Sequence, residues 1–181
     1  MRNIFLRLRE RGTVVIMLLL LSVVVASCGK DDNIIIGANM MNVNGTEMIM
    51  GEATFVEYGP MGSGINCDVA ICSENMFYDV YNSQVNGNGI FVYFEFITSE
   101  SKKLTSGTYS FSASGQQPGI FTANSYYADT RFSGIKVAAT GGRVKVSSSG
   151  NNYSLQFECE YENGAKISGH YQGYPSYYQR Q

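Results

Sequence analysis

Hydrophobic and polar residues alternate in the C-terminal third of the chain with the two-residue period of a half-buried β-strand. From residue 152 to 161 every odd position is apolar and every even position is polar, and residues 165–172 repeat this pattern. Because successive side chains of a strand point to opposite faces of the sheet, we expect the odd-numbered side chains of both segments to be buried. The expected core positions are Tyr153, Leu155, Phe157, Cys159, Tyr161, Ala165, Ile167, Gly169 and Tyr171.

The turn between these two segments fixes how they pair. A two-residue turn at Asn163–Gly164 would pair Glu160 with Ile167 and so place a carboxylate on the face of an isoleucine, which contradicts both alternations. A three-residue loop over 162–164, with its glycine in the left-handed conformation, restores the match between the two strands. It pairs Glu160 with Lys166, which predicts an ion pair on the outward face.

A second tight turn joins residues 143–148 to the same strand. A turn at Gly150–Asn151 pairs Val144 with Phe157 on the buried side, and a turn at Ser149–Gly150 keeps the same faces, so both remain open. The three strands form an antiparallel meander. Its expected outward side chains are Arg143, Lys145, Glu158, Glu160, Lys166 and His170.

Upstream, short apolar segments separated by Gly, Asn and Pro predict further strands. Their expected ranges are 47–58, 64–73, 76–82, 89–98, 107–112, 118–124 and 131–138. Residues 90–97 are largely apolar at odd and even positions alike, so this strand should be central in the sheet or covered on both faces. With no useful stretch of helical period, the sequence predicts an all-β fold: an antiparallel β-sandwich or a flattened, calycin-like β-barrel of about 8–10 strands.

The N-terminal segment has the layout of an export signal. Four arginines precede a run from Val14 to Val25 that is broken only by Ser22, and small residues then lead to Cys28. The run is shorter than the roughly 18 apolar residues that a spanning helix needs. A signal peptide is therefore expected here rather than a permanent transmembrane helix.

Residues Val25–Cys28 resemble the lipobox of bacterial lipoproteins, and the resemblance implies that Cys28 becomes the lipidated first residue. Gly29–Asp32 is similar to the signal that sends lipoproteins of the Bacteroidota to the outer cell surface. Several acyl chains together give stable membrane anchoring. The expected organisation is a signal peptide at 1–27, a lipidated cysteine and tether at 28–45, and one all-β domain at 46–181.

Composition narrows the classes of function. The chain is 44% hydrophobic and 15% charged, with 20 glycines, which fits β structure better than disorder or a helical bundle. Loss of residues 1–27 removes four of thirteen basic and one of fifteen acidic residues and leaves a net charge of −5. A nucleic-acid partner is not expected at that charge, and a single histidine predicts neither a multi-histidine metal site nor a cofactor.

Three cysteines remain once Cys28 is assigned to the lipid. Cys67 and Cys159 both fall on predicted inward positions, whereas Cys72 has the opposite parity. A disulfide between Cys67 and Cys159 is one interpretation, because exported proteins permit disulfides. Buried thiols that pack as small apolar residues are the other.

Tyrosine is unusually frequent, with 13 residues, and several lie outside the predicted strands. Tyr126 and Tyr127 fall in an apparent loop, and Tyr174, Tyr177 and Tyr178 follow the last strand. Exposed tyrosines stack on sugar rings or anchor protein interfaces, so these five are the candidate binding residues. The alternative is that their rings cover a sheet edge or plug a barrel end.

Catalytic candidates are weak. Glu158 and Glu160 share a face roughly 6.5 to 7 Å apart, but alternation places them on a flat charged surface, whereas a glycosidase needs them in a cleft. His170 lacks a specified acidic partner. No catalytic residue is predicted.

A resemblance to small Bacteroidota lipoproteins rests on four stretches: Gly107–Phe111, Gly142–Ser147, Asn152–Phe157 and Asn163–Gly173. It implies a surface or periplasmic β domain of unassigned activity. The expected function is a non-enzymatic, lipid-anchored module of the outer membrane that binds a glycan, a protein or a neighbouring membrane component. A calycin-like barrel holding a small apolar ligand is the alternative, and a hydrolase is the third.

Overall fold

The computed structural model describes residues 39–180, and all its regular elements there are strands. The signal peptide and Cys28 lie outside the described residues. The strands are β1 (Met40–Val43), β2 (Thr46–Met61), β3 (Gly64–Ser73), β4 (Met76–Asp79), β5 (Gln84–Gly87), β6 (Ile90–Thr98), β7 (Gly107–Ser112), β8 (Ile120–Thr122), β9 (Tyr126–Asp129), β10 (Val137–Ser149), β11 (Asn152–Tyr161), β12 (Lys166–Gly173) and β13 (Ser176–Gln179).

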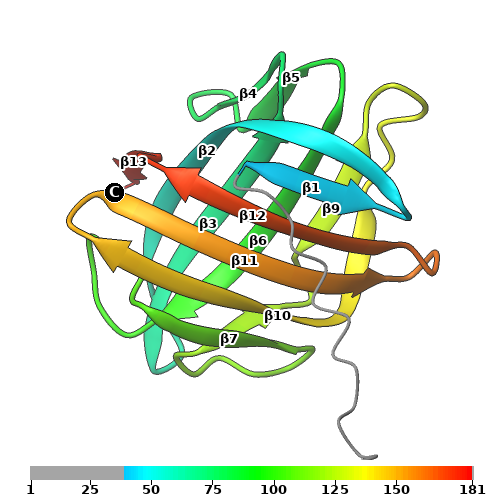
Figure 1. Cartoon of the computed structure of the whole chain (residues 1–181). Coiled ribbons are helices and arrows are strands. Elements are labelled where there is room, and N and C mark those ends of the chain that lie inside the picture. The colour runs from blue at the N-terminus through cyan, green and yellow to red at the C-terminus, as the bar shows by residue number, and fades with distance from the viewer. Residues whose placement is uncertain (1–38, 181) are drawn as a thin grey trace, which may run out of the picture. The chain divides into compact units, whose positions relative to one another are not determined.

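The main sheet closes on itself as a barrel (Figure 1). The hydrogen-bonded order is β1-β12-β11-β10-β7-β8-β6-β3-β2, and β1 then pairs with β2 to complete the ring. Strand β9 pairs with both β10 and β6, and β13 lies beside β2 as an additional hydrogen-bonded strand. The all-β prediction is confirmed in its barrel form. Parallel pairing of β7 with β8 and of β13 with β2 makes the sheet mixed rather than purely antiparallel.

The C-terminal meander has the predicted register. Glu160 lies opposite Lys166, and their side chains form an ion pair of 3.2 Å. Gly164 has a φ of +80°, as the three-residue loop requires. Across the other turn Val144 faces Phe157, which places the turn at Gly150–Asn151. Every predicted core position of the two C-terminal strands is buried.

Aromatic side chains fill the interior of the barrel. The Phe94 ring lies 5.3 Å from Phe96, 5.5 Å from Phe121 and 5.6 Å from Phe157, measured between centroids. Tyr109 packs edge-on against Phe96 at 4.8 Å. Such contacts are typical of a closely packed core. The calycin-like alternative requires these inward rings to line a cavity, and here they pack against one another.

Strand β6 is covered on both faces, as predicted. Its inward residues belong to the main core, and Phe91 on the outward face joins a second cluster with Cys72, Met76 and Ala128. Strands β4 and β5 form a separate two-stranded sheet that supplies Met76 to this outer cluster. On the side of β3 and β6, the barrel is therefore covered from outside by a second apolar layer.

Several boundaries differ from the sequence prediction. The segments expected at 131–138 and 143–148 are replaced by one long strand, β10, whose register shifts between Ala139 and Gly141. The extra residue of this bulge is Thr140, and Gly141–Gly142 lies directly after it inside the strand rather than at a break. Strands β5, β9 and β13 were expected to be turns or loops. Strand β1 falls inside the segment expected to be a tether, and it closes the ring.

The glycine pair after the bulge provides a stability test with a matched control. Gly142 has a φ of +123°, and a Cβ there would lie 2.3 Å from the carbonyl oxygen of Glu158. At Gly141 the nearest atom to an added Cβ is 3.9 Å away. We expect Gly142→Ala to lower the free energy of unfolding by about 2 to 4 kcal/mol, and Gly141→Ala by under about 1 kcal/mol. Urea denaturation measures both, and equal losses would contradict the positive φ and the close backbone contact assigned to Gly142.

Candidate functional site

A shallow groove lies at one end of the meander, where β10 turns into β11 and β12 ends. Its volume is about 400 Å³. The lining residues are Ser147, Ser148, Ser149, Asn152, Ser154, Gln172 and Tyr174. All seven side chains are uncharged, and each has a hydroxyl or an amide group. The groove is therefore a neutral, hydrogen-bonding surface with one aromatic ring.

Strand pairing arranges three of these side chains in a row. Ser154 on β11 lies opposite Ser147 on β10 and opposite Gln172 on β12. All three belong to the outward face, because the positions between them along each strand point into the core. Neighbouring strands are about 4.8 Å apart, so the row presents a polar group at each such step.

Hydrogen bonds beside the groove hold its floor in place. The hydroxyl of Ser154 lies 2.9 Å from Nε2 of His170. The backbone N–H of Ser148 donates to Oγ of Ser106 at 3.1 Å, and the two hydroxyls are also 3.1 Å apart. These contacts tie β10 to the segment before β7 and β11 to β12. The polar row is consequently preorganised on paired strands.

Tyr174 is the aromatic residue of this site. It follows β12, and its side chain is 75% exposed although it lines the groove. A tyrosine ring offers a large apolar face with a polar tip. Hydroxyl and amide groups donate and accept hydrogen bonds with ligand hydroxyls. The arrangement suits a neutral, polyhydroxylated ligand whose ring stacks on Tyr174.

Tyr126 and Tyr127 do not form part of an exposed binding surface. They belong to β9 rather than to a loop, and Tyr127 is only 8% exposed. Its ring packs edge-on against Tyr161, and its hydroxyl accepts a hydrogen bond from Asn163. Tyr126 stacks on Tyr93 with a centroid distance of 4.8 Å. Both rings therefore have a packing role, and Tyr127 is too buried to contact a ligand at the surface.

Tyr177 connects β13 to the neighbouring strand β2. Its hydroxyl donates to the buried carboxylate of Glu57, which also accepts from Ser101 Oγ at 2.6 Å and from Gln179 Nε2 at 3.0 Å. Burial favours a higher pKa for Glu57, but these hydrogen bonds outweigh it and hold the pKa below its ordinary value. Tyr178, the fifth candidate, lies partly exposed on β13. Neither tyrosine lines the groove.

The three weak catalytic candidates lie on the outer wall of the meander. Glu158 pairs with Arg143 at 3.4 Å, and Glu160 pairs with Lys166, both on the exposed face. His170 contacts the hydroxyl of Ser154. None of the three lines the groove or the second pocket described below.

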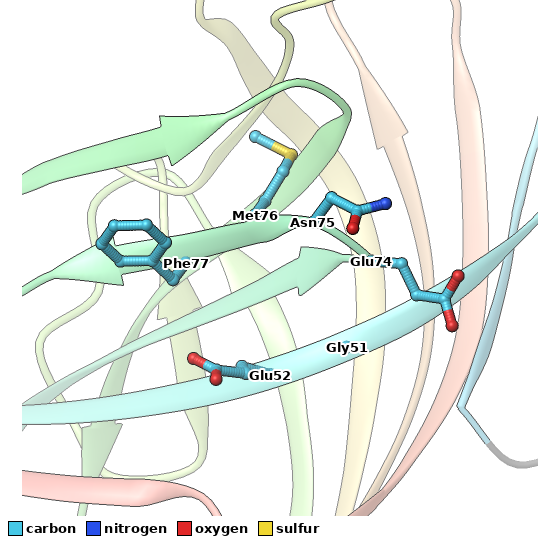
Figure 2. Close-up of a pocket in the computed structure, with 6 residues that line it drawn as sticks. All are labelled: Gly51, Glu52, Glu74, Asn75, Met76 and Phe77. Carbon is cyan, nitrogen blue, oxygen red and sulfur yellow. The ribbon is translucent and has the colours of Figure 1, made fainter.

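A second pocket, of about 590 Å³, lies beside the turn between β3 and β4. It is lined by Gly51, Glu52, Glu74, Asn75, Met76 and Phe77. In Figure 2 the carboxylates of Glu52 and Glu74 point away from each other. Two carboxylates that do not converge supply neither an acid–base pair nor a cation cage. The sequence offered no signal for this pocket.

All three described cysteines are buried free thiols. The proposed bridge between Cys67 and Cys159 is therefore absent from the structure, and the alternative of thiols packed as small apolar residues fits. Burial raises the pKa of Cys72 and of Cys159 to about 12, and it raises that of Cys67 as well. Protonated, enclosed thiols are poor nucleophiles.

A second buried carboxylate, like that of Glu57, was not predicted from the sequence. Asp68, on the outward face of β3, is 5% exposed and lies opposite Glu95 of β6. Its Oδ2 accepts a hydrogen bond from the hydroxyl of Tyr93, whereas Oδ1 has no partner. Burial raises the pKa of Asp68 to about 7, against the effect of the Tyr93 hydrogen bond, and the charge of Glu95 adds to the rise.

No family model, curated protein or solved structure matches the chain. Within residues 39–180 there is no helix with the length and hydrophobicity of a membrane span. The same described part of the chain contains no group of three or more His, Cys, Asp or Glu side chains suited to hold a metal ion.

Asp68 should make stability depend on pH. Its pKa is about 7 in the folded protein and 3.8 in an ordinary environment, so the folded state holds the proton more tightly and stability falls as pH rises from about 4 to about 7. Asp68→Asn removes this loss. The unfolding free energy of the variant relative to wild type should rise by about 2 to 4 kcal/mol from pH 4 to pH 8.

Urea denaturation at several pH values measures this difference. Glu160→Gln, which changes a carboxylate on the exposed face, is the control and should show little change over the same range. A constant difference between Asp68→Asn and wild type would contradict the raised pKa.

Proposed function

We propose that the protein is a non-enzymatic, lipid-anchored module of the outer membrane that binds a neutral glycan in the groove at the end of the meander. The observation that carries the proposal is the lining of that groove, in which seven uncharged hydrogen-bonding side chains include the exposed ring of Tyr174. Sugars combine many hydroxyls with apolar ring faces. Both parts of such a ligand find complementary groups here.

The anchor rests on the N-terminal sequence. The run from Val14 to Val25 followed by small residues and Cys28 supports export and lipidation, and Gly29–Asp32 supports display on the cell surface. A diacylglycerol and a further acyl chain on Cys28 would hold the protein on the membrane. In this arrangement the β domain lies outside the cell and meets glycans there.

Binding is favoured over catalysis by where the ionisable groups lie. Glu158 and Glu160 are engaged in ion pairs on an exposed wall, and the groove itself has no charged lining residue. A hydrolase needs an acid and a base converging on one bond. The small apolar ligand of the calycin-like alternative gains no support from an interior occupied by packed rings.

Substitution of Tyr174 tests the groove. The purified protein is screened on an array of neutral oligosaccharides, and the best hit is titrated by calorimetry. Tyr174→Ala should weaken binding about tenfold or more, because the stacking platform is lost. Tyr174→Phe should retain most of the affinity. Tyr81→Ala, at a 90% exposed tyrosine outside the groove, should have no effect. Absence of any glycan hit, or equal binding by Tyr174→Ala, would refute the proposal.

Substitution of Cys28 tests the anchor. Cys28→Ser removes the sulfur to which the lipid is attached, so the protein should move from the membrane to the soluble fraction. Cys72→Ser, which changes a buried thiol of the barrel, serves as the control and should remain in the membrane fraction. Immunoblots of fractionated cells measure the distribution. Retention of Cys28→Ser in the membrane would count against lipid attachment at this residue.

A further inference from the structure

The loop between β9 and β10 displays two large apolar side chains to solvent. Within its seven residues, 130–136, Phe132 is 83% exposed and Ile135 is 68% exposed. Only Ser133 and Gly134 separate them. Two large hydrophobic side chains together on one protruding loop are unusual for a surface that meets only water.

Hydrogen bonds hold the loop in this form. The carbonyl of Asp129 accepts from the N–H of Gly134 at 2.9 Å, and Gly134 has a φ of +64°. The carboxylate of Asp129 accepts from the backbone N–H of Arg131 at 3.0 Å. At the base, the Thr130 hydroxyl bonds to Gly89 of the neighbouring segment. The apolar side chains are thus presented outward by an ordered turn.

Basic residues flank the apolar pair. Arg131 precedes Phe132, and Lys136 follows Ile135. Arg131 pairs with Asp129 at 2.7 Å, and Lys136 lies 4.5 Å from the centroid of the Tyr126 ring, so the loop retains an excess positive charge beside its apolar tip. An apolar tip with basic flanks is complementary to a bilayer with anionic headgroups.

We propose that the loop 130–136 inserts Phe132 and Ile135 into the interfacial region of the membrane to which the protein is tethered; this inference rests on the proposed lipid anchor. A protein partner would need roughly 800 Å² of surface on each side, which two side chains on a narrow loop do not provide. A bilayer accepts single apolar side chains without such a surface.

The tether is long enough for this contact. Met40 of β1 lies opposite His170 of β12, which lies opposite Gln156 of β11, which in turn lies opposite Lys145 of β10. Lys145 is eight residues from Val137, where β10 meets the loop. That separation is about 26 Å along the strand. Residues 29–38 span up to about 36 Å when extended, so a lipid on Cys28 and the loop can reach one bilayer.

A fluorescent probe tests the contact directly, because the chain contains no tryptophan. Phe132→Trp introduces one indole at the tip. The full-length, membrane-extracted protein is reconstituted into vesicles of phosphatidylethanolamine and phosphatidylglycerol, with and without brominated acyl chains. We expect the emission to shift to shorter wavelength on reconstitution and to be quenched by the brominated lipid. A further Ile135→Ser change should reduce both effects.

Tyr174→Trp is the matched control, because Tyr174 is similarly exposed and lies beyond the opposite end of β10. Its emission should be unchanged. An indole at position 132 that stays in water while the protein is anchored overturns the loop proposal and leaves the anchor intact. A shift without vesicles that depends on protein concentration also overturns it, because a second copy of the chain then covers the loop. If the Cys28→Ser variant stays in the membrane fraction, lipid attachment at Cys28 is rejected. The loop proposal is then judged separately, by whether brominated lipid quenches the indole at position 132.

Discussion

Closure of the sheet is the constraint on which the rest of the structure depends. Strand β1 has only four residues, yet it pairs with β12 on one side and with β2 on the other and thereby joins the first and last parts of the domain. Closure leaves these strands without a free edge. It also encloses an interior of fixed size, which must be filled by side chains or left to a ligand.

In this barrel the interior is filled. Phe94 is in contact with three other aromatic rings, and the buried cluster extends from Met41 on β1 to Tyr171 on β12. A packed interior provides stability and leaves ligand recognition to the outer wall and the strand ends. The groove forms at such an end. There β10 and β11 meet in a turn, and polar side chains take the place of the alternating apolar and polar positions.

The sequence predicts local features of this fold far better than distant ones. The register of the meander follows from two turns and from alternation, because a shift of one residue would expose Phe157 and bury Glu158. Strand β1 forms a hairpin with β2 across Asn44–Gly45, a local signal that was not recognised in the sequence. Its pairing with β12, and the pairings of β9 with β6 and of β13 with β2, join segments far apart in the sequence, and local pattern contains no information on such partners. The glycine pair at 141–142 was misread as a break because glycines with a positive φ occur in turns and also, as at Gly142, inside a strand next to a bulge.

The candidate site was predictable only in part. Tyr174 was expected to be exposed from its place after the last alternating residue, and it is. Tyr127 was misjudged, because the same adjacency of two aromatic residues also occurs in a strand that is covered on both faces. Asp68 lies in an apolar segment that predicts a strand. That segment does not indicate which residues surround the carboxylate. The burial of its carboxylate depends on residues from β6, which only the folded chain brings near.

The groove and the loop 130–136 lie at opposite ends of β10, and this separation relates the two proposals. The strand has 13 residues, which corresponds to roughly 40 Å. A domain whose loop end rests on the bilayer would therefore present Tyr174 well away from the lipid, where large glycans have access. The long strand is possible because the bulge at Thr140 lets β10 bend around the barrel without breaking. The glycine pair that obscured the strand in the sequence thus lies inside the one strand that separates the proposed membrane contact from the proposed ligand site.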